Sequence, residues 1–510
     1  RRRRARGARA GVGRAVRRAR GGCAGGAVTA SGAPSSTQPA APAAPADAIT
    51  AYDALFAGSA GERLAADTQG ALDGQLARRG LVFGEDAATA RPLCTVLRPR
   101  LLTARQHRTL MARTGALARA FAQGHRIAAA DAGLRAQLRL NAWEEGLLAA
   151  APAGELPSPT SRLDLFVVDT AGDGGAVACT EYNAETPAGA GFNDALAESF
   201  LALPAMRAFT RRWHALPLLA RHGVAASLLE AWAAHQARGG SAGVRAPRIG
   251  ILDWADVATR QEFVLFQEHF RTLGLECVIA DPTACEYRDD ALWAPGGERI
   301  DLVYKRVLLH ELVERAGVDT PVLRAWAAGA VCLVNPPSCK LMHKKASLAF
   351  LSDERNARHF DAEARQAIGA MIPWTRVVEE RHTQHRGAAV DLVPHILRHR
   401  DQFVLKPNDD YGGAGIVLGW TVDDGEWEAA VAHALADPYV VQERVAIPSE
   451  PYPSWVDGGV VVAERMIDTA PFVSSGDAAD GVLTRLSTAE LLNVTAGGGS
   501  TVPSFVVEPR

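Results

Sequence analysis

The sequence has no hydrophobic run that approaches the roughly 20 residues of a membrane span, so we expect a soluble, cytoplasmic body with no membrane partner. It also has no Cys-x-x-Cys pair, although it holds seven cysteines. Their odd number and wide scatter argue against a disulfide framework or a zinc site and favour reduced thiols. The GxxxxGK(S/T) spacing of a P-loop is absent as well, which excludes that class of nucleotide site.

Charge is distributed unevenly along the chain. The formal net charge is −2, and ten arginines with a single acid, Asp47, lie in the first fifty residues. The remainder carries 45 basic and 56 acidic residues, a balance that argues against nucleic acid as a specific partner. We expect residues 1–45, rich in Arg, Ala and Pro, to form a disordered tail. That tail is either an inert extension or a non-specific binder of nucleic acid.

The order of patterns predicts an α/β fold with several domains. Residues 46–155 repeat apolar side chains at helical spacing and predict a helical N-terminal region. Residues 156–330 hold a hairpin, followed by RIGILDWAD, TRQEFVLFQEHFRTLG and LECVIADP, the strand, helix and strand of a βαβ unit. Residues 331–510 form a last domain, whose strands are divided by Gly and Pro.

The stretch RLDLFVVDTAGDGGAVACTEYN predicts a β-hairpin, because two runs of alternating apolar and polar residues flank a glycine-rich turn at 170–175. Such a turn pairs residue 169 with residue 176. Counting outward then pairs Asp164 with Glu181. Two carboxylates directly opposite each other destabilise a sheet unless a positive group lies between them.

The same count pairs Arg162 with Asn183, and strand alternation puts all four side chains on one face. Asp164, Glu181 and Asn183 offer hard oxygen atoms, the ligands that magnesium prefers, and Arg162 suits a phosphate beside them. The alternative is a solvated polar face on a surface hairpin, because a slip of one residue in register would scatter the four groups.

A second candidate region is QFVLKPNDDYGGAGIVLGW, in which a strand, Lys-Pro, an acidic turn and a glycine-rich loop precede another strand. Lys406 ends the first strand. The loop from Asp410 holds Gly412, Gly413 and Gly415, which let backbone amides approach an anion closely. The alternative is a plain turn.

Two further elements complete this region. The strand YVVQERVAIP ends in Gln442 and Glu443, which either meet an adenine and its ribose or simply reach solvent. Upstream, Lys344 and Lys345 open a predicted helix, where a lysine pair is otherwise a solvated face.

These elements follow the order in which ATP-grasp enzymes meet their nucleotide. Arg162-Leu-Asp164 and the later E-Y-N-A-E-T-P, which starts at Glu181, resemble the R-x-D and E-Y-N-A-D-T-P motifs of the glutathionylspermidine synthase family. Over roughly residues 155–510 this resemblance implies a circularly permuted ATP-grasp fold with a pre-ATP-grasp βαβ layer. The chain departs from the family at Glu185, where the family has Asp. Its glycine loop, DDYGGAGI, is closer to other ATP-grasp proteins.

The resemblance implies ATP and Mg²⁺ as cofactors. It puts Asp164, Glu181 and Asn183 on magnesium and Arg162 on the reacting phosphate. Arg485, on a closing strand that precedes Asn493 and another glycine cluster, is predicted as a second catalytic residue. The predicted nucleotide-binding residues are Lys345, Lys406, Asp410, Gly412, Gly413, Gly415, Gln442 and Glu443.

The resulting hypothesis is an ATP-dependent ligase for small-molecule or peptide substrates. In this hypothesis ATP phosphorylates a carboxylate, and an amine then attacks the acyl phosphate. Two alternatives stay open: a non-catalytic nucleotide-binding module, and a phosphotransferase without an amine acceptor. The sequence leaves the identity of the two substrates and the oligomeric state open.

Overall fold

The computed structural model describes residues 45–84, 90–152, 154–168, 175–241, 243–410, 413–488 and 499–510. The chain divides into two units, Arg1–Pro42 and Ala43–Arg510, and all described residues belong to the second. Nearly all of the predicted tail, most of the predicted 170–175 turn, Gly412 and Asn493 therefore lie outside the described residues. The predicted boundaries after residues 155 and 330 stay predictions.

The fold is mixed α/β, as the sequence predicts at this coarse level. Helices fill much of the N-terminal region. They are α1 (Pro45–Asp53), α2 (Gly58–Arg79), α3 (Ala104–Ala130), α4 (Ala132–Arg135) and α5 (Ala142–Ala149). The region also contributes strands that its helical spacing does not predict, namely β1 (Val82–Phe83), β2 (Arg91–Pro92) and β3 (Arg100–Thr103).

The largest sheet has eight strands, in the order β3-β23-β22-β21-β4-β5, with β20 paired to β21 and β6 paired to β23. It joins segments from both ends of the described chain. Its remaining strands are β4 (Thr160–Val168), β5 (Ala176–Asn183), β6 (Trp213–Pro217), β20 (Ser449–Val456), β21 (Gly459–Ser474), β22 (Ala478–Ser487) and β23 (Ser500–Pro509).

A parallel sheet contains the predicted βαβ unit. Its order is β13-β12-β7-β8, and β7, α9 and β8 form the expected strand, helix and strand. IDLVYKRV supplies β12 to the same sheet, as predicted. The strands are β7 (Ile249–Leu252), β8 (Cys277–Ala280), β12 (Leu302–Lys305) and β13 (Cys332–Val334). The helices of this middle part are α6 (Ala190–Leu201), α7 (Pro204–Phe209), α8 (Arg221–Ala237), α9 (Arg260–Thr272), α10 (Leu309–Ala316) and α11 (Pro321–Ala327).

A four-stranded antiparallel sheet, in the order β14-β19-β17-β18, carries the predicted glycine-loop elements. Its strands are β14 (Thr375–Val377), β17 (Phe403–Pro407), β18 (Val417–Leu418) and β19 (Tyr439–Glu443). The nearby helices are α12 (Lys340–His343), α13 (Ala346–Ser352), α14 (Ala362–Met371), α15 (Leu392–Arg398) and α16 (Asp424–Ala436). Three small sheets remain among the described residues: the pair β1 and β2, the three strands β9 (Glu286–Arg288), β10 (Ala291–Trp293) and β11 (Arg299–Ile300), and the pair β15 (His382–His385) and β16 (Ala388–Asp391).

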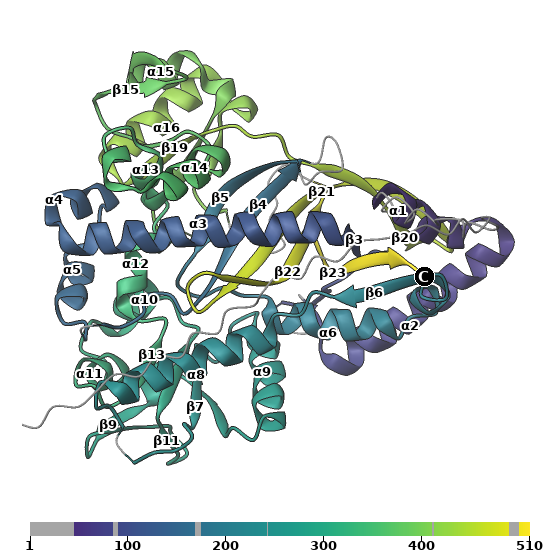
Figure 1. Ribbon diagram of the computed structural model, residues 1–510, viewed down its shortest axis with the longest axis horizontal. Helices are drawn as coiled ribbons and strands as arrows, with labels where there is room; N and C mark the ends of the chain where they lie inside the picture. The colour runs from purple at the N-terminus through teal and green to yellow at the C-terminus, as the bar shows by residue number, and fades with distance from the viewer. Residues whose placement is uncertain are drawn as a thin grey trace, which may run out of the picture. The chain divides into compact units, whose positions relative to one another are not determined.

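Helix α3 crosses one face of the large sheet (Figure 1). Thr103 and Gln106 form a capping box that starts this helix, and buried side chains such as Leu110, Leu117 and Phe121 recur at helical spacing along it. Gly124 permits a close approach, because a Cβ there would lie 2.9 Å from a Leu351 methyl group. The helix thus packs against one face of the sheet, over the predicted hairpin.

No helix among the described residues is long and apolar enough to cross a membrane. The six cysteines in the described segments are free thiols, and five of them are buried.

Buried ion pairs join the hairpin to the parallel sheet and to α12. Glu185 is fully buried just after β5, and its carboxylate contacts Lys305 Nζ at 3.0 Å and Lys340 Nζ at 3.1 Å. The Glu185 carboxylate also accepts a hydrogen bond from the Leu309 backbone amide at 2.6 Å. Burial raises the pKa of the Glu185 carboxyl, but Lys305 and Lys340 outweigh this effect and hold that pKa well below its usual value. Glu185 is therefore shared by two buried ammonium groups, and Asp409 supplies a second carboxylate to Lys340.

We expect Glu185→Gln to lower the free energy of unfolding by about 3–5 kcal/mol, because it leaves the buried Lys305 ammonium group without its counter-charge. Denaturant unfolding of the intact chain measures the change. Glu363→Gln is the matched control: Glu363 pairs with Arg119 at the surface, and its loss is expected to change stability by about 0.5 kcal/mol or less. Equal effects of the two substitutions would contradict the role given to Glu185.

Candidate functional site

The hairpin of β4 and β5 has the predicted register where it matters. Asp164 lies opposite Glu181, and Arg162 lies opposite Asn183. Near the turn the prediction is wrong by one residue, because Val168 pairs with residue 176 in place of residue 169. An irregularity between positions 164 and 165 absorbs the difference, since β5 has one extra residue there.

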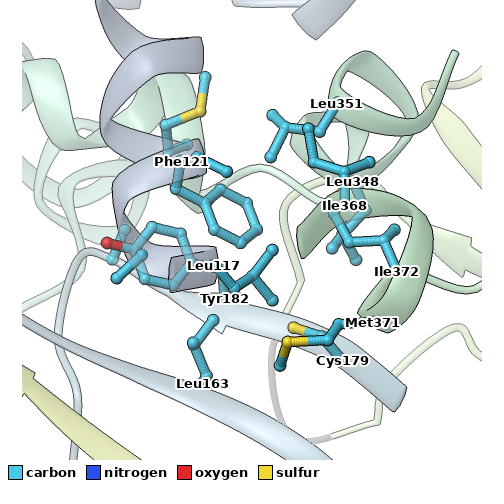
Figure 2. Close-up of a cluster of buried hydrophobic side chains, with 14 of the residues drawn as sticks. Leu117, Phe121, Leu163, Cys179, Tyr182, Leu348, Leu351, Ile368, Met371 and Ile372 are labelled. Carbon is cyan, nitrogen blue, oxygen red and sulfur yellow. The ribbon is translucent and has the colours of Figure 1, made fainter. Parts of the chain in front are cut away.

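Alternation along the two strands separates a polar face from an apolar one. Leu163 and Tyr182 turn toward α3, where Leu117 and Phe121 cover them (Figure 2). The Phe121 and Tyr182 rings stack with their centroids 4.1 Å apart. This packing fixes the register, because a slip of one residue would expose the apolar face. Asp164 and Glu181 consequently face the opposite side.

On that side the carboxylates line a cavity between the large sheet and the antiparallel sheet. Eight of the predicted site residues line it: Asp164, Glu181, Lys345, Lys406, Gly413, Gln442, Glu443 and Arg485. The cavity has a volume of about 170 Å³. It shares four lining residues with an adjoining hollow of about 540 Å³. The hollow brings the available space into the usual range of ligand pockets, roughly 300–1,000 Å³.

Asp164 is held by two guanidinium groups. Arg162 forms a forked pair with its carboxylate, with Nε–Oδ1 at 2.8 Å and Nη2–Oδ2 at 3.1 Å. Arg485 donates to Oδ2 at 2.6 Å. Burial raises the pKa of Asp164, but the two arginines more than reverse this and lower that pKa. Asp164 is therefore an ionised oxygen donor inside the cavity.

The two predicted phosphate lysines meet the hairpin. Lys345 Nζ lies 3.1 Å from Glu181 Oε1. Lys406 Nζ donates to the Thr180 carbonyl at 3.1 Å and to Gln442 Oε1 at 2.8 Å. Thr180 is the extra residue of β5 at the irregularity, so the irregularity supplies a carbonyl acceptor for Lys406. Burial chiefly, with Lys345 nearby, lowers the pKa of Lys406 to about 8, although Glu181 acts to raise it.

The loop that contains the glycines starts from a fixed base. Asn408 bonds to the Ala346 amide at 2.8 Å and to the Leu138 carbonyl at 3.0 Å. Gly413 and Gly415 have φ of +82° and +67°, a conformation that favours glycine. A Cβ on Gly415 would also come within 2.8 Å of the Pro407 ring.

Strand β19 presents both of its predicted site residues, Gln442 and Glu443, to the cavity. Gln442 is held between Lys406 and Thr375. Glu443 is paired with Arg386 at 2.5 Å and contacts His385 at 3.5 Å.

Four predicted residues do not line the cavity: Arg162, Asn183, Asp410 and Gly415. Arg162 is engaged by Asp164 and by the Ala188 carbonyl. The Asp410 backbone carbonyl accepts a hydrogen bond from Lys345 Nζ, and Asp410 itself is exposed. Among the described residues no group of three or more His, Cys, Asp or Glu side chains is arranged to hold a metal ion. The predicted metal set thus contributes two adjacent carboxylates to the cavity, Asp164 and Glu181.

Sequence reasoning misses Asp468, a buried acid on β21 that also lines the cavity. It shares Arg485 with Asp164. Burial, with Asp164 nearby, raises the pKa of Asp468 to about 6, although Arg485 acts to lower it. One acid in a strand carries no local signal of this role, because its partner Arg485 comes from the next strand.

The scarcity of lysine is a further signal of the site in the composition of the chain. The chain has 55 lysines and arginines together, and only five are lysines: Lys305, Lys340, Lys344, Lys345 and Lys406. All five lie in the cavity or in the buried network beside it. Lys344 is 2% exposed and pairs with Glu144 and Asp409. The alternative that the lysine pair lies on a solvated helix face is therefore wrong for Lys344. Asp409 also contacts Lys340 at 2.6 Å, which anchors the base of the glycine loop.

The cavity chemistry fits a magnesium nucleotide. Lys345, Lys406 and Arg485 supply positive charge for phosphates, and Asp164 with Glu181 supplies hard oxygen atoms for magnesium. The apolar side chains that a purine ring requires also line the cavity: Val404, Ile416, Leu418, Val445 and Ile447.

No family model matches the chain. A putative glutamate–cysteine ligase 2-3 from Frankia alni is 27% identical over 237 residues, which are 44% of this chain and 26% of that protein. The chain thus matches about a quarter of that relative's length. The solved structure of a glutathione synthetase-like effector from Globodera pallida, in its apo form, matches with a TM-score of 0.57 and 12% identity over 87% of this chain and 97% of that chain. This second likeness concerns the fold. Neither relative is a glutathionylspermidine synthase, so that closer resemblance stays a prediction.

We expect Lys406 to react with trace acetic anhydride at pH 8 faster than any other lysine of the native chain. A lysine with a pKa near 8 is roughly half neutral at that pH, whereas an ordinary lysine is less than about 1% neutral. Mass spectrometry resolves the five lysines individually. Saturating MgATP is expected to protect Lys406.

Lys305 is the internal control, because it is 2% exposed and held by Glu185. Native Lys406 that reacts no faster than the same residue in urea-denatured protein would contradict the lowered pKa.

Proposed function

We propose that the chain is an ATP- and magnesium-dependent carboxylate–amine ligase with a circularly permuted ATP-grasp site. One observation carries the proposal: the carboxylates of the β4–β5 hairpin meet Lys345 and Lys406, more than 150 positions later, in one cavity. The likeness in fold to a glutathione synthetase-like protein supports it, as does the partial sequence match to a putative glutamate–cysteine ligase.

The order of the elements along the chain supports the permuted arrangement. The carboxylates come from β4 and β5, before the lysines and the glycine loop, whereas an ordinary ATP-grasp enzyme carries its metal-binding acids after them. The closing strands β21 and β22 then return beside β4 in the same sheet. This return brings Arg485 back to the hairpin that begins the site.

The proposed reaction has two steps. A substrate carboxylate oxygen bonds to the γ-phosphorus of ATP while the bond from that phosphorus to the bridging oxygen breaks, and ADP leaves. The acceptor nitrogen then bonds to the acyl carbon while the carbon–oxygen bond to phosphate breaks. Inorganic phosphate leaves with one of the two protons that the ammonium nitrogen loses, and the other goes to solvent.

The side chains of the cavity position and neutralise the reacting groups. Asp164 and Glu181 would hold magnesium, which supplies charge neutralisation at the phosphates when it is bound. Lys345 and Lys406 would contact the phosphates. Arg485 would stabilise charge that develops on the transferred group, because it is the arginine of the predicted pair that lines the cavity.

Arg162 takes a different part from the one predicted for it. Its forked bond with Asp164 and its bond to the Ala188 carbonyl fix the orientation of the Asp164 carboxylate. We therefore propose Arg162 as a positioning residue rather than as the contact to the reacting phosphate.

The test is a turnover assay with MgATP, a pool of amino acids, dicarboxylic acids and small peptides as donors, and hydroxylamine as acceptor. An active ligase is expected to release ADP and to form a hydroxamate, the product of hydroxylamine and an acyl phosphate. Nucleotide binding with neither product would support a non-catalytic module. ADP release that yields a phosphorylated product and no hydroxamate would support a phosphotransferase.

We expect Arg485→Gln to lower kcat about 10²- to 10³-fold in this assay, the usual loss on removing one group that stabilises transition-state charge. The affinity for MgATP is expected to change less. Arg119→Gln, on the surface of α3, is the matched control. Thermal unfolding of each variant is measured first. A folded Arg485→Gln protein with turnover within about threefold of wild type would remove the role given to Arg485.

A further inference from the structure

One buried carboxylate of the cavity has no task in the mechanism above. Asp468 lies on β21 with 3% of its surface exposed. It lines the same cavity as Asp164 and Arg485. Its Oδ2 accepts a hydrogen bond from Arg485 Nη2. Its Oδ1 is buried and has no hydrogen-bond partner in the described part of the chain.

The neighbouring acids are satisfied, and Asp468 is not. Asp164 uses both of its oxygens on Arg162 and Arg485, and Glu181 pairs with Lys345. A buried carboxylate oxygen without a donor is unfavourable, because it has lost its water and gained nothing in return. The site therefore has one open position for a hydrogen-bond donor, and a positively charged donor suits it best.

Two cations could fill this position: a metal ion or a substrate ammonium group. Magnesium requires several oxygen ligands in near-octahedral geometry, whereas Asp468 offers one open oxygen, Oδ1, because Arg485 holds Oδ2. An ammonium group needs only one strong acceptor. The shared contact of Arg485 with Asp164 and Asp468 places this acceptor beside the proposed phosphate site.

We propose that Asp468 binds the amino group of the acceptor substrate through Oδ1 and so selects a primary amine that is charged in solution. The inference rests on the proposed ligase function. It makes Asp468 a specificity-determining residue of the second step, in addition to its contact with Arg485.

The test compares two acceptors on Asp468→Asn with the donor pool and MgATP of the turnover assay. Hydroxylamine is mostly neutral at pH 7.5 and needs no ammonium site. The second acceptor is a pool of amino acids and polyamines, whose amines are charged at that pH, and mass spectrometry measures the amides. Because Asp468 also holds Arg485, the variant is expected to slow the formation of both products. We expect the amine concentration for half-maximal amide formation to rise at least about tenfold and the hydroxylamine concentration for half-maximal hydroxamate formation to change less than about threefold, since a charged hydrogen bond is lost only for the ammonium acceptor.

Further variants separate this result from other causes. Asp457→Asn makes the same chemical change at the exposed turn between β20 and β21 and is expected to behave as wild type. Asp468→Glu keeps the charge and is expected to recover part of the amine affinity. If Asp468→Asn fails to fold by thermal unfolding, Asp468→Ser replaces it under the same criteria.

Each remaining outcome overturns the inference. Equal loss of hydroxamate and amide, together with weaker Mn²⁺ binding, would make Asp468 a metal ligand. Unchanged amide formation would leave it without a role in the acceptor site. A wild-type protein that forms neither product fails the ligase proposal itself, and hydroxamate without any amide in the wild type would exclude a charged-amine acceptor within the pool tested.

Discussion

The pairing of Asp164 with Glu181 across β4 and β5 is the constraint on which the rest of the site depends. Two opposed carboxylates are unfavourable unless cations reach them, and here the cations come from distant parts of the chain. Arg485 approaches from the C-terminal strands and Lys345 from the segment before α13. The hairpin thus draws the large sheet and the antiparallel sheet to a common cavity, and its own register is held from behind by the stack of Tyr182 on Phe121.

Most charged groups of the cavity have partners within the protein, and Asp468 Oδ1 is an exception among the described residues. The lysines and arginines that would bind phosphates donate hydrogen bonds to carboxylates and carbonyls of the protein. Lys406, for example, donates to the Thr180 carbonyl. Under the proposed function, a nucleotide with its metal ion would exchange with these contacts: phosphates would replace the carboxylates around the cations, and the metal ion would replace the cations around the carboxylates. Either partner alone would leave one set of charges unmatched, so nucleotide and metal ion are expected to enter together.

The hairpin part of the candidate site can be predicted from the sequence, because alternation along a strand determines which side chains share a face. That rule predicts the register of Asp164 and Glu181 but not the irregularity beside them, since one extra residue leaves no mark on the pattern. The βαβ unit is predicted for a different reason, namely the order of an apolar strand, an amphipathic helix and a second apolar strand. The inner position of Lys344 and the capture of Arg162 by Asp164 depend on partners far along the chain. Strand β3 is missed because its four residues lie directly before the long helix α3.

The scarcity of lysine has a practical consequence. All peptide bonds that a lysine-specific protease recognises follow Lys305, Lys340, Lys344, Lys345 or Lys406, so no surface loop elsewhere is a substrate for it. Cleavage of the native chain by such an enzyme would report transient opening of the parts that contain the site. The rate of digestion is therefore a direct readout of local breathing at the cavity, free from the background that cleavage elsewhere normally adds.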